Sequence, residues 1–161
     1  MKEHLHRGIR NQRLCIDMAD AFLNVGHECN ERDRKAQEAD LFFESDAFYA
    51  FPAIVNAAFA CELYLKALIA KTQGSQATGH SLSDLFERLT AEERTALRKE
   101  YAARSQYSME IDEVLRIHSK SFADWRYAFE NGKENIEAYP DNLITAAVVV
   151  KEYLQRKEGH K

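Results

Sequence analysis

One apolar helical segment, residues 53–70, constrains the fold of this chain more than any other feature. It carries apolar side chains on every face, interrupted by Glu62 and Lys66 one helical turn apart. A helix that is apolar all round has to be buried in a protein core or in a membrane. A membrane span would place Asn56 and both charged side chains in lipid, each charge at a cost of about 2.5–3.5 kcal/mol. We therefore expect the buried central helix of a bundle, and no membrane contact.

Helical periodicity also marks the first part of the chain. Steps of three and four residues predict an amphipathic helix over residues 7–30. Its core-facing stripe is expected to be Cys15, Met18, Phe22, Val25 and Cys29. Residues 28–40 mix both charge signs with no apolar run, which indicates a solvated helix end and a connection. The central helix either runs on from Ser45 with a kink at Pro52, or begins afresh with Pro52 in its first turn.

Capping signals organise the region after the central helix. Residues 72–74 are expected to end that helix and residues 75–79 to form a loop. Ser81 with Asp84 resembles a capping box before a short helix, and Thr90 with Glu93 is a stronger one. The second box opens a charged helix that is expected to reach residue 106 at the periphery of the bundle.

Two more helices complete the pattern. Ser108 can cap a helix whose apolar stripe runs from Ile111 through His118 to Phe129, with Gly132 at its end. Residues 143–154 are expected to form the last helix, although they include a β-branched run of the kind that favours a strand. The sequence therefore predicts an all-α fold, an antiparallel up-and-down bundle of five to six helices, in a single domain over residues 1–161.

Charge and cysteine content exclude several classes of protein. A net charge of −4 argues against a broadly basic nucleic-acid surface, so any such contact has to be focal. The three cysteines include no Cys-x-x-Cys pair, which argues against a disulfide framework and a zinc knuckle. Residues 1–6 have no apolar signal-peptide core. We expect a cytoplasmic protein.

The charged pair on the central helix has two interpretations. Glu62 and Lys66 stand in the i, i+4 orientation that favours an ion pair. Because the surrounding helix is apolar, both charges should be half-buried and need each other or a further partner. The pair is then either structural, or supplies polar contacts at a bundle seam or subunit interface.

Two further groups are candidates for chemistry. Residues 122–131 are dense in aromatic side chains around Arg126, a set that can grip a phosphate and stack a base, or can equally be core packing. His80 follows the loop at the start of a helix, where it can act as an acid or base, bind an anion, or serve only as a turn residue. The histidines show no metal-ligand spacing, and no common enzyme motif is present, so neither a metal nor a cofactor is expected.

Three segments in order resemble HEPN-domain proteins: residues 56–69, residues 79–85 and residues 122–130. The resemblance implies an all-α bundle, usually dimeric, from prokaryotic toxin-antitoxin or antiphage systems, often beside a nucleotidyltransferase. Many members cut RNA, with an arginine followed four to six residues later by a histidine at a cleft in the dimer interface. Here Arg126 is followed by Asn131 at the nearest such position, and asparagine cannot titrate as a general base.

Two hypotheses follow from this departure. In the first, the chain is a homodimeric HEPN-like RNA- or nucleotide-binding protein with metal-independent RNase activity and a nucleotidyltransferase-type antitoxin partner. In the second, it is a non-catalytic helical dimer or interaction module. The first assigns catalysis to the residues Arg126, His80 and Glu130. It assigns RNA or nucleotide binding to the residues Glu62, Lys66, Trp125, Tyr127 and Asn131.

Overall fold

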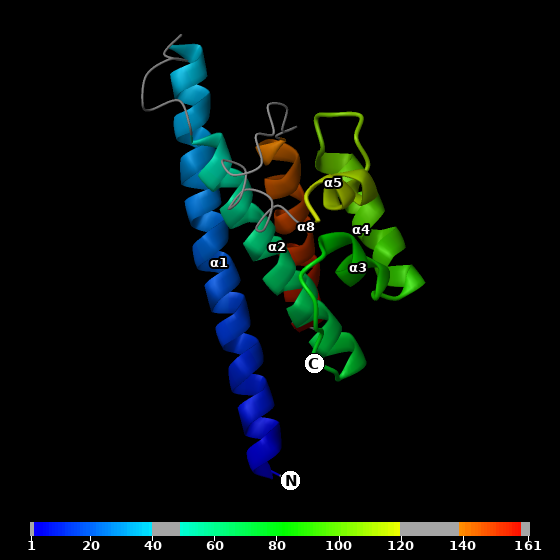
Figure 1. The fold of residues 1–161 in the computed structure, drawn as a ribbon. Coiled ribbons are helices and arrows are strands. Elements are labelled where there is room, and N and C mark those ends of the chain that lie inside the picture. The colour runs from blue at the N-terminus through cyan, green and yellow to red at the C-terminus, as the bar shows by residue number, and fades with distance from the viewer. Residues whose placement is uncertain (1, 40–48, 120–138, 159–161) are drawn as a thin grey trace.

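The structure is a computed structural model that describes residues 2–39, 49–119 and 139–158, with side chains from residue 12 onward. Within these ranges the chain is helical and contains no strand (Figure 1). The helices are α1 (Lys2–Glu38), α2 (Ala50–Gln73), α3 (Leu82–Glu87), α4 (Ala91–Arg104), α5 (Ile111–Ile117) and α8 (Pro140–Glu158). The expected all-α bundle of five to six helices is confirmed.

The longest helix, α1, packs along α2 in the antiparallel sense. The Gln12 amide donates to the carbonyl oxygen of Ala67, while Gly26, near the other end, lies against Ala57. A Cβ atom on Gly26 would stand 3.3 Å from the backbone nitrogen of Ala57. Glycine at this position therefore lets the two helix backbones approach closely.

The last helix, α8, is also antiparallel to α1. Asn30 donates to Asp141 at 2.7 Å, and the Lys151 ammonium lies 2.8 Å from Asp20. It follows that α2 and α8 run in the same direction, which Figure 1 shows in teal and orange. The chain returns between them through α3, α4 and α5, which pack on the side of α2 and α8 that faces away from α1.

The expectation for α1 is wrong in two respects. The charged stretch 28–40 is not mainly a connection, because α1 continues to Glu38. The buried row is not the expected stripe either, since Met18 and Val25 are exposed. The row against the bundle is instead Ala19, Leu23, Gly26, Asn30, Asp33 and Ala36. The buried arc is apolar at Ala19 and Leu23 but polar at Asn30 and Asp33, and an apolar arc lies next to it, so periodicity alone did not show which arc is buried.

The central helix α2 begins at Ala50, with Pro52 in its first turn, and ends where Gly74 adopts a left-handed conformation at φ 67°. Its N-cap residue makes no side-chain cap. Asp33 of α1 supplies that cap from a distance, because its carboxylate accepts a hydrogen bond from the backbone nitrogen of Ala50 at 3.0 Å. This contact between two helices satisfies a backbone N–H group that has no hydrogen-bond partner within the first turn of α2.

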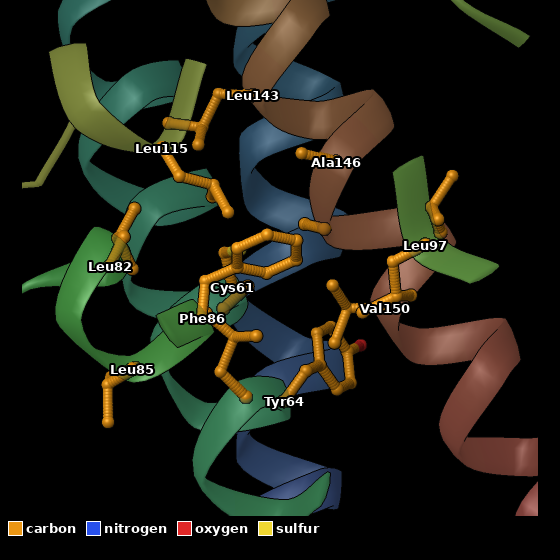
Figure 2. Packing of buried hydrophobic residues seen from close by; sticks show 14 of the residues in the cluster. Cys61, Tyr64, Leu82, Leu85, Phe86, Leu97, Leu115, Leu143, Ala146 and Val150 are labelled. Atoms are coloured by element: carbon orange, nitrogen blue, oxygen red, sulfur yellow. The ribbon is translucent and has the colours of Figure 1, made fainter. Parts of the chain in front are cut away.

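The same helix is long and apolar enough to cross a membrane by composition, but most of its apolar window is buried inside the bundle. Tyr64, Leu65 and Leu68 are all fully buried. Burying one such side chain contributes about 1.5–3 kcal/mol. Figure 2 shows α2 side chains meeting those of α3, α4, α5 and α8 in one cluster. The labelled members are Cys61, Tyr64, Leu82, Leu85, Phe86, Leu97, Leu115, Leu143, Ala146 and Val150. Burial favours the core helix over the membrane span.

A polar contact joins all three long helices beside this core. The hydroxyl of Tyr64 donates to Asp20 on α1, and the same carboxylate oxygen accepts from Lys151 on α8. Burial, followed by the hydrogen bond to Asp20, raises the pKa of Tyr64 strongly. The phenol therefore stays protonated and acts as a donor.

The capping box predicted for α4 is confirmed, whereas for α3 only the N-cap half of the predicted box is present. Ser81 accepts a hydrogen bond from the backbone nitrogen of Asp84, and Thr90 forms a reciprocal capping box with Glu93. The charged helix α4 ends at Arg104, two residues before the expected position.

The helix expected from residue 111 to Phe129 is shorter than predicted, and the predicted N-cap residue is wrong. Glu110, rather than Ser108, is the N-cap residue of α5, and the helix ends at Ile117 with His118 as C-cap. The apolar spacing continues beyond this point in the sequence, but residues 118 and 119 form a turn. The hydroxyl of Ser119 donates to the carbonyl oxygen of Leu115 and accepts from the backbone nitrogen of Ser83. Residues 120–138, including the proposed end at Gly132, lie outside the described ranges.

Candidate functional site

The structure contains the Glu62–Lys66 ion pair predicted on the central helix, and His80 contacts the same carboxylate. The Lys66 ammonium lies 2.7 Å from Oε1 of Glu62, and Nδ1 of His80 lies 3.0 Å from the same oxygen. We call these three residues the Glu62 cluster. Two of them meet because i and i+4 share one helix face, whereas His80 arrives from the loop that follows α2.

The exposure of the three side chains differs sharply. The Glu62 carboxyl side chain is 6% exposed and Lys66 is 20% exposed, whereas the His80 ring is 85% exposed. A buried carboxylate is costly unless charged or polar donors satisfy it. Here the two donors do so, and the imidazole covers the carboxylate while remaining open to solvent.

This geometry determines how a neutral His80 ring carries its hydrogen. Nδ1 faces a carboxylate, which accepts hydrogen bonds only, so the hydrogen belongs on Nδ1. The other nitrogen, Nε2, then has a free lone pair, and it makes no hydrogen bond to the described part of the chain. A carboxylate that orients an imidazole in this way prepares the second nitrogen to accept a proton.

Local backbone chemistry brings His80 to Glu62. Gly79, the preceding residue, has φ 94°, a conformation that L side chains rarely adopt. Ser81, the following residue, is extended and caps α3. The left-handed glycine and the cap together turn the chain back towards α2, which places the imidazole over the carboxylate.

Three serine hydroxyls lie directly beside this turn. Ser119 Oγ lies 2.7 Å from Ser83 Oγ and accepts from the backbone nitrogen of Ser83 at 3.0 Å, and Ser81 Oγ donates to it at 3.3 Å. These bonds tie the end of α5 to the start of α3, one residue from His80. Sequence reasoning missed Ser83 and Ser119, because serines separated by 36 residues leave no local signal of their contact.

Helix α1 borders the Glu62 cluster through Cys15. Its thiol donates to the backbone carbonyl of Leu63 at 3.5 Å. Burial raises the pKa of Cys15, an effect that Lys66 opposes and Glu62 reinforces. The thiol is thus a half-buried neighbour of the cluster, not the core residue that the stripe on α1 predicted.

A separate hollow of about 250 Å³ lies between α3 and α5. Its lining is rich in carboxylates and includes one arginine, in the set Ser83, Phe86, Glu87, Glu110, Asp112, Glu113, Leu115 and Arg116. Such a wall repels phosphate, so this hollow is not the site for an anionic ligand. The Glu62 cluster, in which two donors contact one carboxylate, is the better candidate for the functional site.

The remaining predicted site residues are not placed. Trp125, Arg126, Tyr127, Glu130 and Asn131 all lie outside the described ranges. The structure therefore brings together the predicted residues Glu62, Lys66 and His80, and leaves the roles of the other five as predictions. In the described ranges no three metal-ligating side chains come together as a site for an ion.

The arrangement has the parts needed for proton abstraction beside an anion. An exposed imidazole nitrogen can take a proton from a hydroxyl, and a neighbouring ammonium can neutralise charge on a phosphate. Both are fixed by one carboxylate. Proton abstraction from a hydroxyl can therefore use side chains that the Glu62 cluster itself contains.

Comparison with known proteins agrees with the fold. A family model of the HEPN domain matches residues 31–138, which include the Glu62 cluster and about two thirds of the chain. No curated protein and no solved structure matches the chain significantly. HEPN domains are all-α and generally act as ribonucleases or bind nucleotides in toxin and defence systems. The chain belongs to the HEPN domain family.

Proposed function

We propose that this protein is a metal-independent endoribonuclease in which His80 is the general base. The observation that carries the proposal is the 3.0 Å contact between Nδ1 of His80 and the buried carboxylate of Glu62. It supplies an oriented, solvent-open imidazole in a chain that has Asn131 where the family's nuclease members carry their histidine.

The proposed reaction uses RNA's own 2′-hydroxyl. Nε2 of His80 takes the 2′-hydroxyl proton, and the 2′-oxygen attacks the adjacent phosphorus. The bond from phosphorus to the 5′-oxygen breaks, that oxygen takes a proton from water, and the hydroxide left behind removes the proton from Nε2 of His80. The products are a 2′,3′-cyclic phosphate and a free 5′-hydroxyl, so atoms and charge balance without a metal.

Cationic side chains would hold the phosphate. Lys66 lies beside the imidazole on the same carboxylate, where its ammonium can approach a phosphate oxygen. On sequence grounds we assign the family's phosphate-binding arginine to Arg126. Trp125 and Tyr127 are assigned to base stacking, and Glu130 and Asn131 to further contacts with the RNA or nucleotide.

The cellular setting is proposed from family membership alone. HEPN domains generally occur in toxin and defence systems, and we propose the same setting here, with a nucleotidyltransferase-type antitoxin as partner. A neighbouring nucleotidyltransferase gene, and suppression of growth arrest by that gene product, would support this part of the proposal.

Cleavage of end-labelled RNA in the presence of EDTA tests the chemistry. The His80→Ala variant should lose about 10²-fold to 10⁴-fold in rate, the usual contribution of a general base. Arg126→Ala should lose cleavage as well, and a strand with 2′-deoxyribose at the cleaved position should resist it. His27→Ala, which changes an exposed histidine on α1, is the matched control and should keep the parent rate.

Two outcomes would contradict the proposal. One is cleavage that survives His80→Ala in a protein whose circular dichroism is unchanged. The other is intact RNA with every preparation, together with no saturable nucleotide binding. The second outcome would leave the non-catalytic helical interaction module as the function of the chain.

A further inference from the structure

Ser119, which directly follows the C-cap residue of α5, is the centre of a hydrogen-bond cluster that reaches the start of α3. Its hydroxyl donates to the carbonyl oxygen of Leu115 at 2.8 Å, which uses its single hydrogen. Its oxygen accepts from the backbone nitrogen of Ser83 at 3.0 Å and lies 2.7 Å from Ser83 Oγ. Ser81 Oγ donates to the same oxygen at 3.3 Å. We call Ser81, Ser83 and Ser119 the serine cluster.

The serine cluster completes the hydrogen bonding at the N-terminus of α3. The first N–H groups of a helix have no partner within that helix. Ser81, the N-cap residue, accepts from the nitrogen of Asp84 at 3.2 Å, whereas the nitrogen of Ser83 is satisfied by Ser119. A side chain that follows α5 thus supplies a second cap to α3. Because Ser81 directly follows His80, this cap fixes the backbone on one side of the imidazole.

The backbone on the other side of His80 is held by α3 itself. Arg88, the C-cap residue of α3, donates to the carbonyl oxygen of Thr78 at 3.2 Å. Gln73, at the end of α2, donates to the carbonyl oxygen of Arg88 at 2.5 Å. These contacts connect the loop before His80 to α2 and α3, whereas Ser119 connects the residues after His80 to α5.

The His80 ring depends on this backbone because packing does not hold it. Its side chain is 85% exposed, and its Nδ1 contacts the Glu62 carboxylate at 3.0 Å. Glu62 is fixed within α2, so the length of this contact follows from the backbone position at the start of α3. A shift of about 1 Å there would take the contact out of hydrogen-bond range. A misplacement of this size can lower a reaction rate by about 10²-fold.

We propose that Ser119 is a positioning residue for His80 and acts through Ser81 and Ser83. It fixes the first turn of α3 against α5 and so keeps Nδ1 of His80 on the Glu62 carboxylate. The catalytic consequence rests on the proposed function, in which His80 is the general base, but the placement of the ring does not require RNA. Ser119 offers one donor and two acceptor positions to the cluster. Threonine carries the same hydroxyl on Cβ, whereas alanine carries none.

Long-range ¹H–¹⁵N correlation spectra of the histidine rings test the placement without RNA, and the His80→Ala protein identifies the signal. The parent protein should show the Nδ1–H tautomer that the Glu62 contact requires. In Ser119→Ala the signal should move towards the Nε2–H form, and in Ser119→Thr it should match the parent. Ser105→Ala is the matched control, because Ser105 makes two hydrogen bonds with Tyr107 in the loop between α4 and α5. It should leave the His80 signal unchanged.

Cleavage kinetics test the catalytic consequence. Ser119→Ala should lower kcat by about tenfold and change KM by less than about twofold, since the general base is displaced while the contacts with RNA remain. Ser119→Thr and Ser105→Ala should keep the parent kcat. Circular dichroism verifies that each variant is folded. If Ser119→Ala does not fold, Ser119→Cys replaces it in both measurements, because a thiol keeps the size of the side chain but is a weak acceptor.

The proposal is overturned if the His80 signal of the folded Ser119→Ala protein matches the parent signal, or if Ser119→Thr shifts it as much as alanine does. An equal loss of kcat in Ser105→Ala would also overturn it, since the effect would then not be specific to the serine cluster. A shifted His80 signal in Ser119→Ala, together with intact RNA in every preparation, would support the positioning role and contradict the proposed endoribonuclease. The two proposals therefore fail separately.

Discussion

Glu62 and His80 are eighteen residues apart in the chain, yet a single carboxylate oxygen of Glu62 lies 3.0 Å from Nδ1 of His80. One member is buried in α2 and the other is open to solvent. The buried Glu62 carboxylate accepts hydrogen bonds only, and it therefore orients an imidazole ring that lies at the surface. The same oxygen also receives Lys66, so removing either donor changes how the carboxylate is satisfied.

The first prediction concerns the tautomer of His80. With Glu62 present, the neutral ring should carry its hydrogen on Nδ1, as the carboxylate requires. Long-range ¹H–¹⁵N correlation spectra of the histidine rings measure this directly. In the Glu62→Ala variant the signal should move towards the Nε2–H tautomer that free histidine prefers. An unchanged spectrum would show that the contact does not orient the ring in solution.

The second prediction concerns the hydroxyl of Tyr64. Tyr64→Phe removes the donor to Asp20 and leaves the ring in place, so the free energy of unfolding should fall by about 1 kcal/mol. The loss is limited because Asp20 keeps its ion pair with Lys151. Urea denaturation measures it. Tyr107→Phe, at an exposed loop position, serves as the control and should change stability by less than about 0.5 kcal/mol.

The third prediction concerns the close approach of α1 and α2. Gly26→Ala gains about 1 kcal/mol of helix propensity, but its Cβ atom meets backbone atoms of Ala53 and Ala57 at 3.3 Å. Backbone cannot rotate away, so we expect a net destabilisation of about 1–2 kcal/mol. His27→Ala on the same helix should be neutral or stabilising. A stabilised Gly26→Ala protein would show that the helices can separate without loss.

The fourth prediction concerns the buried His118. Burial lowers the pKa of His118 from 6.5 to about 4. Between these pH values the unfolded chain binds a proton at this ring and the folded protein does not. The free energy of unfolding should therefore fall as the pH falls from 6.5 to 4, by about 3 kcal/mol at most. In His118→Leu this part of the pH dependence should disappear, and an unaltered slope would assign it to other groups.

The fifth prediction concerns thiol reactivity. Cys61 is fully buried, and burial raises its pKa to about 12, so almost no thiolate is present at neutral pH. Cys15 and Cys29 are only half-buried. Mass spectrometry after native alkylation should find label on these two, and label on Cys61 only after denaturation. Early modification of Cys61 would reveal local opening of the core.

Several elements of the fold were predictable because their signals are local. The Thr90–Glu93 capping box and the stop at Gly74 depend on residues within one helical turn. The same holds for the Glu62–Lys66 ion pair, since i, i+4 residues meet on any helix that forms. The end of α5 was not predictable in this way, because apolar spacing continues past Ile117 in the sequence, whereas the contact of Ser119 with Ser83 joins residues 36 positions apart.

The amino-acid sequence by itself determined that this chain is a helical bundle with a buried charged pair, because helix periodicity, caps and i, i+4 contacts act over a few residues. Only the tertiary structure decided which side of α1 is buried, since the arc of Met18 is apolar but exposed, whereas the buried arc of Ala19 also carries the polar residues Asn30 and Asp33. It also decided that His80 completes the Glu62 cluster. A loop and a left-handed glycine set that contact, and the spacing of two residues across a loop does not specify their distance in space.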